Sequence, residues 1–208
     1  MNLSHGRYAS VVVRNRQSMT PFRSSLLKKI QAAGVILRDR GPMDRLRLLK
    51  LLYIADREAL QERGVPIIGG LIVAMKHGPL HSEVYDLIKG AHVNEADWSA
   101  YIISQGNTIT LKSDPGRLDI SPYEIDKLNA VTDHYQDLDT WELSELTHDF
   151  EEWKDSFVKG ASRPISSERL LKEVGKLAPW EWRGASRPIS VFLTSAIRLT
   201  TQQQAVTQ

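Results

Sequence analysis

Asp56, His77, His81 and His148 are the residues whose type and spacing could do chemistry in this chain. Imidazoles and carboxylates are the side chains most often used to bind metals and to move protons. His77 and His81 are four residues apart, which is the spacing of two metal ligands on one helical face. However, a Gly-Pro pair lies between them, which predicts that a helix begins only after His77. The two imidazoles then need not share a face, and we predict no metal site.

His148 is followed by Asp149 and Glu151 and could belong to an acid–base or metal cluster. Adjacent residues on a helix point about 100° apart, so we expect a surface patch in which His148 bonds to the backbone. A hydrolase or nuclease site built from Asp56, His77 and His148 is an alternative that requires these groups to converge in a cleft. The sequence contains no HExxH, GxSxG, Walker-type or dinucleotide-binding motif. We therefore predict that the protein is not an enzyme and holds neither metal nor cofactor.

Asp56 is unusual because it lies in an apolar helical stripe, within the run KLLYIADRE at 50–58. At about 100° per residue, the segment from Met43 to Arg63 gathers six apolar residues on one arc. These residues are Leu46, Leu48, Leu49, Leu52, Tyr53 and Leu60. A carboxylate on that arc must be buried, and an unpaired buried charge costs several kcal/mol. We expect Asp56 to have an internal partner, either a cluster of backbone N–H groups or a basic side chain.

The sequence Lys76-His77-Gly78-Pro79 is the candidate partner of Asp56. It lies where a buried strand is expected to pass into a helix N-terminus, and exposed N–H groups make such a corner suited to an anion. On this hypothesis Asp56 joins its helix to the corner without any ligand. The rival hypothesis is that an acidic side chain of a partner protein occupies the corner instead.

Charge and composition set the class of protein. The chain has 208 residues, 41% of them hydrophobic and 25% charged, which predicts one soluble globular domain. The absence of cysteine excludes disulfides, cysteine-ligated metals and thiol nucleophiles. No apolar run approaches the roughly 20 residues of a membrane span, and the N-terminal apolar run is too short for a signal peptide, so we expect a cytoplasmic protein. The net charge is only +2, which makes nucleic acid an unexpected partner.

Turn and cap signals divide the chain. We expect a flexible leader over 1–19, a compact domain over 20–158, and a weakly structured tail over 159–208. In the compact domain the patterns predict a helix from Thr20-Pro21 to about Arg38 and a second from 43 to 63 ending at Gly64. A buried strand within 65–76 and a helix from 78 to 90 follow.

The second half of the domain is predicted in the same way. YIISQGNTITLK at 101–112 predicts a hairpin that the earlier strand joins. Ser121, Pro122 and Glu124 form a capping-box pattern that predicts another helix, and Thr140 caps one more. The fold class is α+β, a mostly helical single domain with a small antiparallel sheet. In the tail the heptapeptide GASRPIS occurs twice, at 160–166 and 184–190. We expect the polar end of the tail to be disordered or to fold on a partner.

Three separated blocks resemble the Panacea domain of SocA-like antitoxins. The blocks are KLLYIADRE (50–58), AMKHGPLHSEVYDLIKG (74–90) and SELTHDFEEW (144–153), and the resemblance covers about 22–158. It implies a helical domain with a small sheet, encoded in mobile elements and prophages. It also implies an antitoxin that neutralises a cognate toxin by direct binding and, in one branch, delivers that toxin to a AAA+ protease as a proteolytic adaptor. The resemblance assigns no catalytic residues.

The resemblance maps twelve signature positions onto this chain, which either contact the partner or hold the fold. They are Lys50, Tyr53, Asp56, Lys76, His77, Gly78, Pro79, Ser82, Tyr85, Thr147, His148 and Trp153. We expect the toxin to bind around the second helix and the corner at 76–79. The remaining alternative is a nucleic-acid-binding regulator, for which one basic segment is the candidate footprint. Its residues are Arg38, Arg40, Arg45, Arg47 and Lys50.

Overall fold

The computed structural model describes residues 22–175, which form an α+β domain with two small antiparallel sheets, so the predicted fold class is confirmed. The helices are α1 (Leu26–Arg40), α2 (Arg45–Arg63), α3 (Ser82–Ile88), α4 (Glu95–Tyr101), α5 (Pro122–His134), α6 (Thr140–Leu146), the 3₁₀ turn η1 (Thr147–Asp149), α7 (Glu151–Ser156) and α8 (Ser167–Glu173). The strands are β1 (Met43–Asp44), β2 (Ile72–Met75), β3 (Gly78–His81), β4 (Ile102–Gln105), β5 (Thr108–Leu111) and β6 (Arg163–Ile165).

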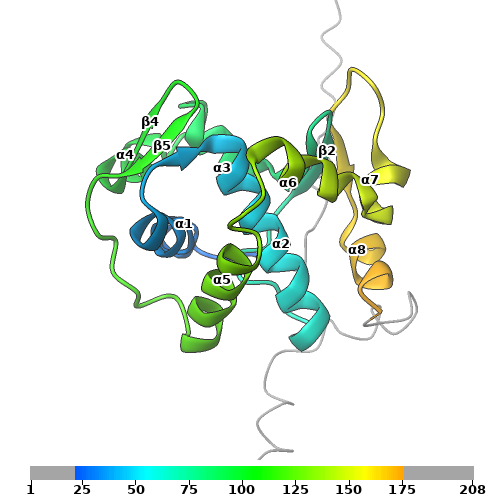
Figure 1. Ribbon diagram of the computed structural model, residues 1–208, viewed down its shortest axis with the longest axis horizontal. Helices are drawn as coiled ribbons and strands as arrows, with labels where there is room; N and C mark the ends of the chain where they lie inside the picture. The colour runs from blue at the N-terminus through cyan, green and yellow to red at the C-terminus, as the bar shows by residue number, and fades with distance from the viewer. Residues whose placement is uncertain (1–21, 176–208) are drawn as a thin grey trace, which may run out of the picture.

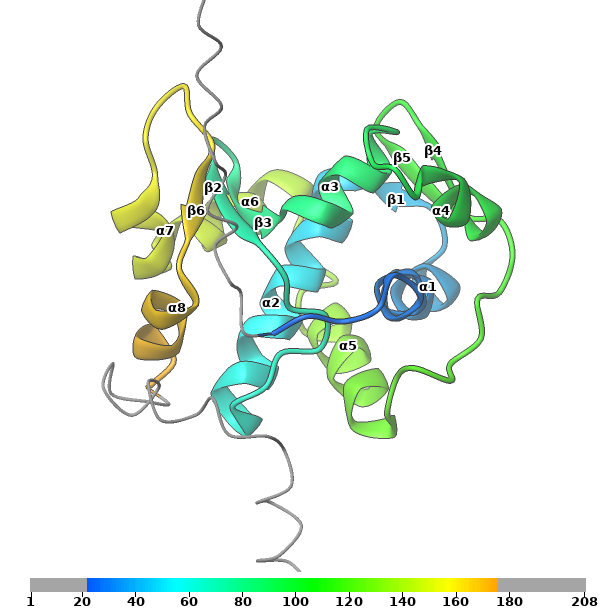
Figure 2. The same ribbon diagram turned by 180° about the vertical axis from the view of Figure 1, so that it is seen from behind.

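Helix α2 lies at the centre of the fold. Figures 1 and 2 show α1, α4 and the β4–β5 hairpin on one side of it, and β2, β6, α7 and α8 on the other. Its residues from Leu48 to Asp56 are all buried, together with Ala59 and Leu60. The helix therefore presents almost no surface of its own to a partner, apart from its ends. Within residues 22–175, no helix has both the length and the apolar composition needed to cross a membrane.

Local cap signals placed several helix boundaries correctly. The predicted end of the second helix is confirmed, since Gly64 adopts the left-handed conformation (φ 74°) and its N–H bonds to Leu60. The capping box of α5 is confirmed in full, with Ser121 and Glu124 each bonded to the other's backbone. Asp139 rather than Thr140 is the N-cap of α6. Helix α1 begins at Leu26 with Ser25 as its N-cap, and Thr20 and Pro21 lie outside the described residues.

The predicted sheet topology is wrong in one respect. The hairpin at 101–112 is confirmed as β4 and β5, but it pairs with β1 in the order β1-β5-β4. The buried strand β2 belongs to a second sheet, ordered β3-β2-β6. The predicted helix at 78–90 is also wrong at its start, because Gly78–His81 forms β3 against β2 and the helix begins only at Ser82.

Part of the expected weak tail belongs to the folded domain. The first GASRPIS copy contains β6, which pairs with β2 so that Ile72 lies opposite Ile165. Helix α8 follows and buries Leu170 and Leu171 in the core. The segment 159–175 is therefore ordered against the remainder of the fold, contrary to the expectation. The second copy at 184–190 and the leader at 1–19 lie outside the described residues.

Candidate functional site

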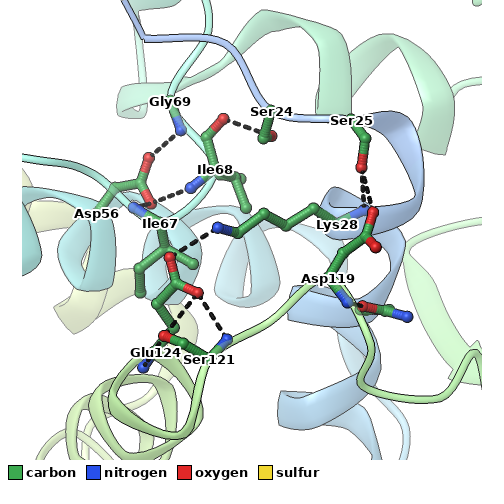
Figure 3. A network of polar contacts seen from close by, with 11 residues as sticks. Ser24, Ser25, Lys28, Asp56, Ile67, Ile68, Gly69, Asp119, Ser121 and Glu124 are labelled. Carbon is green, nitrogen blue, oxygen red and sulfur yellow. Dashed lines mark hydrogen bonds and ion pairs between the residues drawn. The ribbon is translucent and has the colours of Figure 1, made fainter. Parts of the chain in front are cut away.

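Asp56 holds the loop that precedes β2. Its Oδ1 accepts hydrogen bonds from the backbone N–H groups of Ile67 and Ile68, both at 2.9 Å, and its Oδ2 accepts one from Gly69 at 2.7 Å (Figure 3). The residue is only 2% exposed. Ser24, at the entry to α1, donates to the carbonyl of Ile68 and fixes the same loop from the other side (Figure 3). The expected backbone N–H cluster is confirmed, but it lies at 67–69, and the predicted partner at 76–79 is wrong.

His81 completes the surroundings of Asp56. Its Nδ1 lies 2.9 Å from the carbonyl oxygen of Gly69, which can only accept, so Nδ1 carries the proton. The opposite ring nitrogen, Nε2, lies 3.4 Å from Asp56 Oδ2. Burial raises the pKa of Asp56 and lowers the pKa of His81, while each group's charge opposes the other's shift. The contact is favourable when one proton lies between the two groups.

The side chain of Lys50 holds the turn between β2 and β3. Its side chain is fully buried, and Nζ donates a 2.7 Å hydrogen bond to the carbonyl of Pro79. Gly78 lies in the same turn and has φ 86°. A Cβ added at Gly78 would overlap Thr147 Oγ1 and lie 2.8 Å from Lys50 Nζ. Glycine is required here on both counts, because the backbone is left-handed and the space is occupied. Lys50 therefore holds the turn and is not available as a surface cation.

The third sequence block wraps around the same turn. Ser144 donates to the carbonyl of His77 at 3.1 Å, and Thr147 donates back to Ser144 at 2.7 Å. Trp153 donates from its ring nitrogen to the carbonyl of Met75 at 2.9 Å. His148 stacks on Trp153 with the ring centroids 4.1 Å apart. Polar groups of residues 144–153 thus bond the carbonyls of Met75 and His77, so the third block holds the turn in the second.

A buried carboxylate that the sequence analysis missed ties α7 to α2. Glu152 is fully buried, and its Oε1 accepts hydrogen bonds from the hydroxyl of Tyr53 and from Nε of Arg57, both at 2.7 Å. Arg57 also lies over the ring of Phe150 at 4.3 Å. Glu152 stands beside the exposed Glu151 in a short acidic segment, and the sequence offers no signal that separates the two.

We expect the free energy of unfolding to rise with pH between about 7 and 10 more steeply in the wild type than in a Lys50→Met variant. Burial lowers the pKa of Lys50 from 10.5 to about 7. Between those values the unfolded chain binds a proton that the folded chain has released, so raising the pH favours the folded state. One pKa unit corresponds to about 1.4 kcal/mol, so the difference between the two proteins should grow by roughly 2 kcal/mol between pH 7 and 9.

Urea unfolding of both proteins at several pH values measures this difference. Lys159→Met, which removes an exposed lysine, is the matched control and should retain the pH dependence of the wild type. Parallel curves for the wild type and Lys50→Met would contradict the prediction.

A cavity of about 490 Å³ opens beside the turn. Its wall combines the N-terminal turn of α2, the β2–β3 turn, Tyr85 of α3, Asn107 of the β4–β5 turn and the start of α6. Trp141 at the mouth is 60% exposed, and its ring meets that of His77 edge-on at 5.3 Å. Among the signature residues, the exposed Lys76 together with His77, Gly78 and Tyr85 faces the cavity. Ser82 instead donates its backbone N–H to Leu71 and begins α3.

The structure does not assemble the composite site of Asp56, His77 and His148. Asp56 is enclosed by the 67–69 loop and His81, whereas His77 faces the cavity and His148 covers Trp153. His77 lines the cavity, whereas His81 contacts Asp56, so the two imidazoles do not share a site. Among residues 22–175, no cluster of three or more histidine or carboxylate side chains is arranged to hold a metal ion.

Most residues of the proposed basic footprint are engaged by other groups of the domain. Arg38 pairs with Asp114, Arg40 pairs with Asp133, and Arg47 donates to the carbonyls of Tyr135, Gln136 and Leu138. Lys50 is buried. Of the five residues only Arg45 keeps its charged group without an ion pair or hydrogen bond within residues 22–175.

These contacts define a small α+β domain in which three sequence blocks hold one tight turn beside an open cavity. A family model described as the antitoxin SocA-like, Panacea domain matches residues 48–154, just over half of the chain, and the chain belongs to this family. Membership supports a role in a toxin–antitoxin system in general terms. No curated protein and no solved structure matches the chain.

Proposed function

We propose that this protein is a cytoplasmic antitoxin that neutralises a cognate protein toxin by binding it directly, without catalysing a reaction. The family description supports the toxin–antitoxin role. Direct binding is supported by the exposure of Trp141, whose large side chain is 60% exposed at a cavity of about 490 Å³. Tryptophan is enriched among the residues that dominate protein–protein binding, and such residues pair with pockets.

The signature residues divide into two roles on this proposal. Lys50, Tyr53, Asp56, Thr147 and Trp153 make internal hydrogen bonds and hold the fold. Lys76 and His77 stand at the cavity, where a toxin can reach them. The contact face is therefore narrower than the second helix and corner expected from the sequence, because the middle of α2 is buried.

Co-expression with the protein encoded beside it tests the proposal. The neighbouring protein alone should arrest growth, and the wild-type antitoxin should restore growth and co-purify with its toxin. Trp141→Ala should weaken the toxin's binding at least tenfold, as expected for a central aromatic contact. Leu118→Ala, which truncates a side chain that is 96% exposed and outside the cavity, is the matched control and should bind as the wild type does.

Failure of the wild type to restore growth or to co-purify with the toxin would refute direct neutralisation. Full binding by Trp141→Ala would refute the contact face alone. The same cells test the adaptor role, because an adaptor for a AAA+ protease shortens the half-life of the toxin, whereas a stoichiometric inhibitor leaves it unchanged or lengthens it.

A further inference from the structure

We propose that the cavity beside the 75–79 turn receives a bulky apolar side chain from an acidic segment of the partner, whose carboxylates pair with Arg45 and Lys76. This inference rests on the proposed function for the statement that the partner is a toxin. It goes beyond that function by naming the chemistry of the segment that is recognised.

The cavity wall includes several apolar side chains. Leu46 and Leu49 of α2, Met75 and Leu80 of the β2–β3 hairpin, and the ring of Trp141 contribute to its wall. At about 490 Å³ it falls within the range of cavities that enclose a small molecule or a large side chain. Burying an aromatic or leucine side chain from water is favourable, so an apolar group fits this part of the wall.

The two carboxylates in the wall are already engaged. Asp44 is the N-cap of α2 and accepts the backbone N–H of Leu46 at 2.7 Å. Asp139 is the N-cap of α6 and accepts the backbone N–H groups of Trp141 and Glu142 at 2.7 and 2.8 Å. Each carboxylate therefore caps a helix, and neither forms an ion pair with Arg45 or Lys76.

The two cations in the wall are not engaged. The charged groups of Arg45 and Lys76 make no hydrogen bond or ion pair with any residue in the part of the chain that the structure describes, 22–175. Burial lowers the pKa of His77, and the charges of Lys76, Lys50 and His148 lower it further, against a smaller opposite effect of Glu145. Two cations without partners beside apolar side chains are complementary to carboxylates that flank an apolar side chain.

A protein segment fits these features better than nucleic acid does. A phosphate backbone is bound by a row of free cations, but Arg38, Arg40 and Arg47 are committed to internal partners. The apolar side chains of the wall would also remain uncovered against a phosphate backbone. An acidic segment with one large apolar residue uses both the cations and the apolar side chains.

Fluorescein-labelled peptides of eight residues test the inference on the full-length protein. The probe is a peptide of aspartate and glutamate around a central phenylalanine. One comparison peptide has alanine at the centre, and the other has lysine in place of every acidic residue. Fluorescence anisotropy should show saturable binding of the probe, at least tenfold tighter than that of either comparison peptide.

Charge reversal identifies the site. Binding of the probe should fall at least tenfold in the double variant Arg45→Glu/Lys76→Glu, and Lys159→Glu, which reverses an exposed lysine elsewhere, should bind as the wild type does. If the double variant loses its thermal transition, the binding measurement uses Lys76→Glu alone. Lys76 is an exposed turn residue, so this single variant should still fold. Equal binding of the alanine or lysine peptide, or an unchanged affinity in these variants, would overturn the inference. Tighter binding of a DNA duplex that the same reversals abolish would overturn it as well.

The growth assay separates this inference from the proposed function. A double variant that folds and neutralises the toxin as well as the wild type does would overturn the cavity inference and leave the antitoxin role intact. A wild type that fails to neutralise would refute the antitoxin role, and the peptide measurements would still decide whether the cavity selects acidic, apolar segments.

Discussion

Replacing Gly78 with alanine is expected to lower the free energy of unfolding by about 2–5 kcal/mol. The left-handed backbone at φ 86° costs an L-residue about 1–2 kcal/mol. The new Cβ would also overlap Thr147 Oγ1 and press on Lys50 Nζ, and overpacking of this kind costs about 1–3 kcal/mol. For a domain of this size the melting temperature should fall by roughly 10 °C, which calorimetry measures directly.

Gly64→Ala is the matched control, because Gly64 has φ 74° and no heavy atom within 4 Å of the added Cβ. It should lose only the backbone contribution, about 1–2 kcal/mol. Adding Thr147→Ala to Gly78→Ala removes the hydroxyl that overlaps, so the two substitutions should cost less together than their sum. Equal losses in Gly78→Ala and Gly64→Ala would show that the turn is not tightly packed.

Asp56→Asn is expected to lower the free energy of unfolding by about 3–5 kcal/mol, the usual cost of breaking a buried charged contact. The carboxylate accepts three backbone N–H groups, two on Oδ1 and one on Oδ2. An amide supplies one acceptor oxygen, and its NH₂ group must face either the N–H of Gly69 or those of Ile67 and Ile68. At least one buried donor is then left without a partner. Urea unfolding at pH 7 measures the effect.

Asp119→Asn is the matched control, since Asp119 is exposed and its carboxylate accepts a bond from the hydroxyl of Ser25. It should change the free energy of unfolding by no more than about 0.5 kcal/mol. Unchanged stability of Asp56→Asn together with loss of toxin binding would instead favour a role for Asp56 in the partner interface.

Local signals explain what the sequence predicted well. The stripe and the glycine cap placed α2 to within two residues, and the Ser121–Glu124 capping box placed α5, because both signals depend only on neighbours along the chain. The burial of Asp56 and its need for an internal partner followed from the cost of an unpaired charge. These features need no knowledge of what packs against them.

The sequence failed to predict features that depend on pairing between distant segments. Gly78 and Pro79 resemble a helix start, yet they pair with Met75 and Ala74 in β3. Proline is tolerated there because β3 is an edge strand, where a missing N–H can face away from the sheet. In the same way, two loops could have supplied N–H groups to Asp56, and only the tertiary arrangement selects 67–69 over 76–79.

The candidate site likewise combines features that the sequence marks with features that depend on distant segments. Lys50 and Tyr53 were marked by the family resemblance, but their burial and their partners, Pro79 and Glu152, depend on segments 29 and 99 residues away. The cavity itself joins side chains from five separate parts of the chain. Its free cations could not be recognised from sequence, since the neighbouring Arg38, Arg40 and Arg47 are of the same type and are all paired.

The position of β6 sets a minimum length for any working fragment. The segment that the family model matches stops at residue 154, but one neighbour of β2 in its sheet is supplied by 163–165, and α8 follows it. A fragment trimmed to that segment would leave the amides and carbonyls of 72–74 open to strands of other molecules, a common origin of aggregation. Fragments meant for crystallisation, or for grafting this domain onto other proteins, should therefore extend through residue 175.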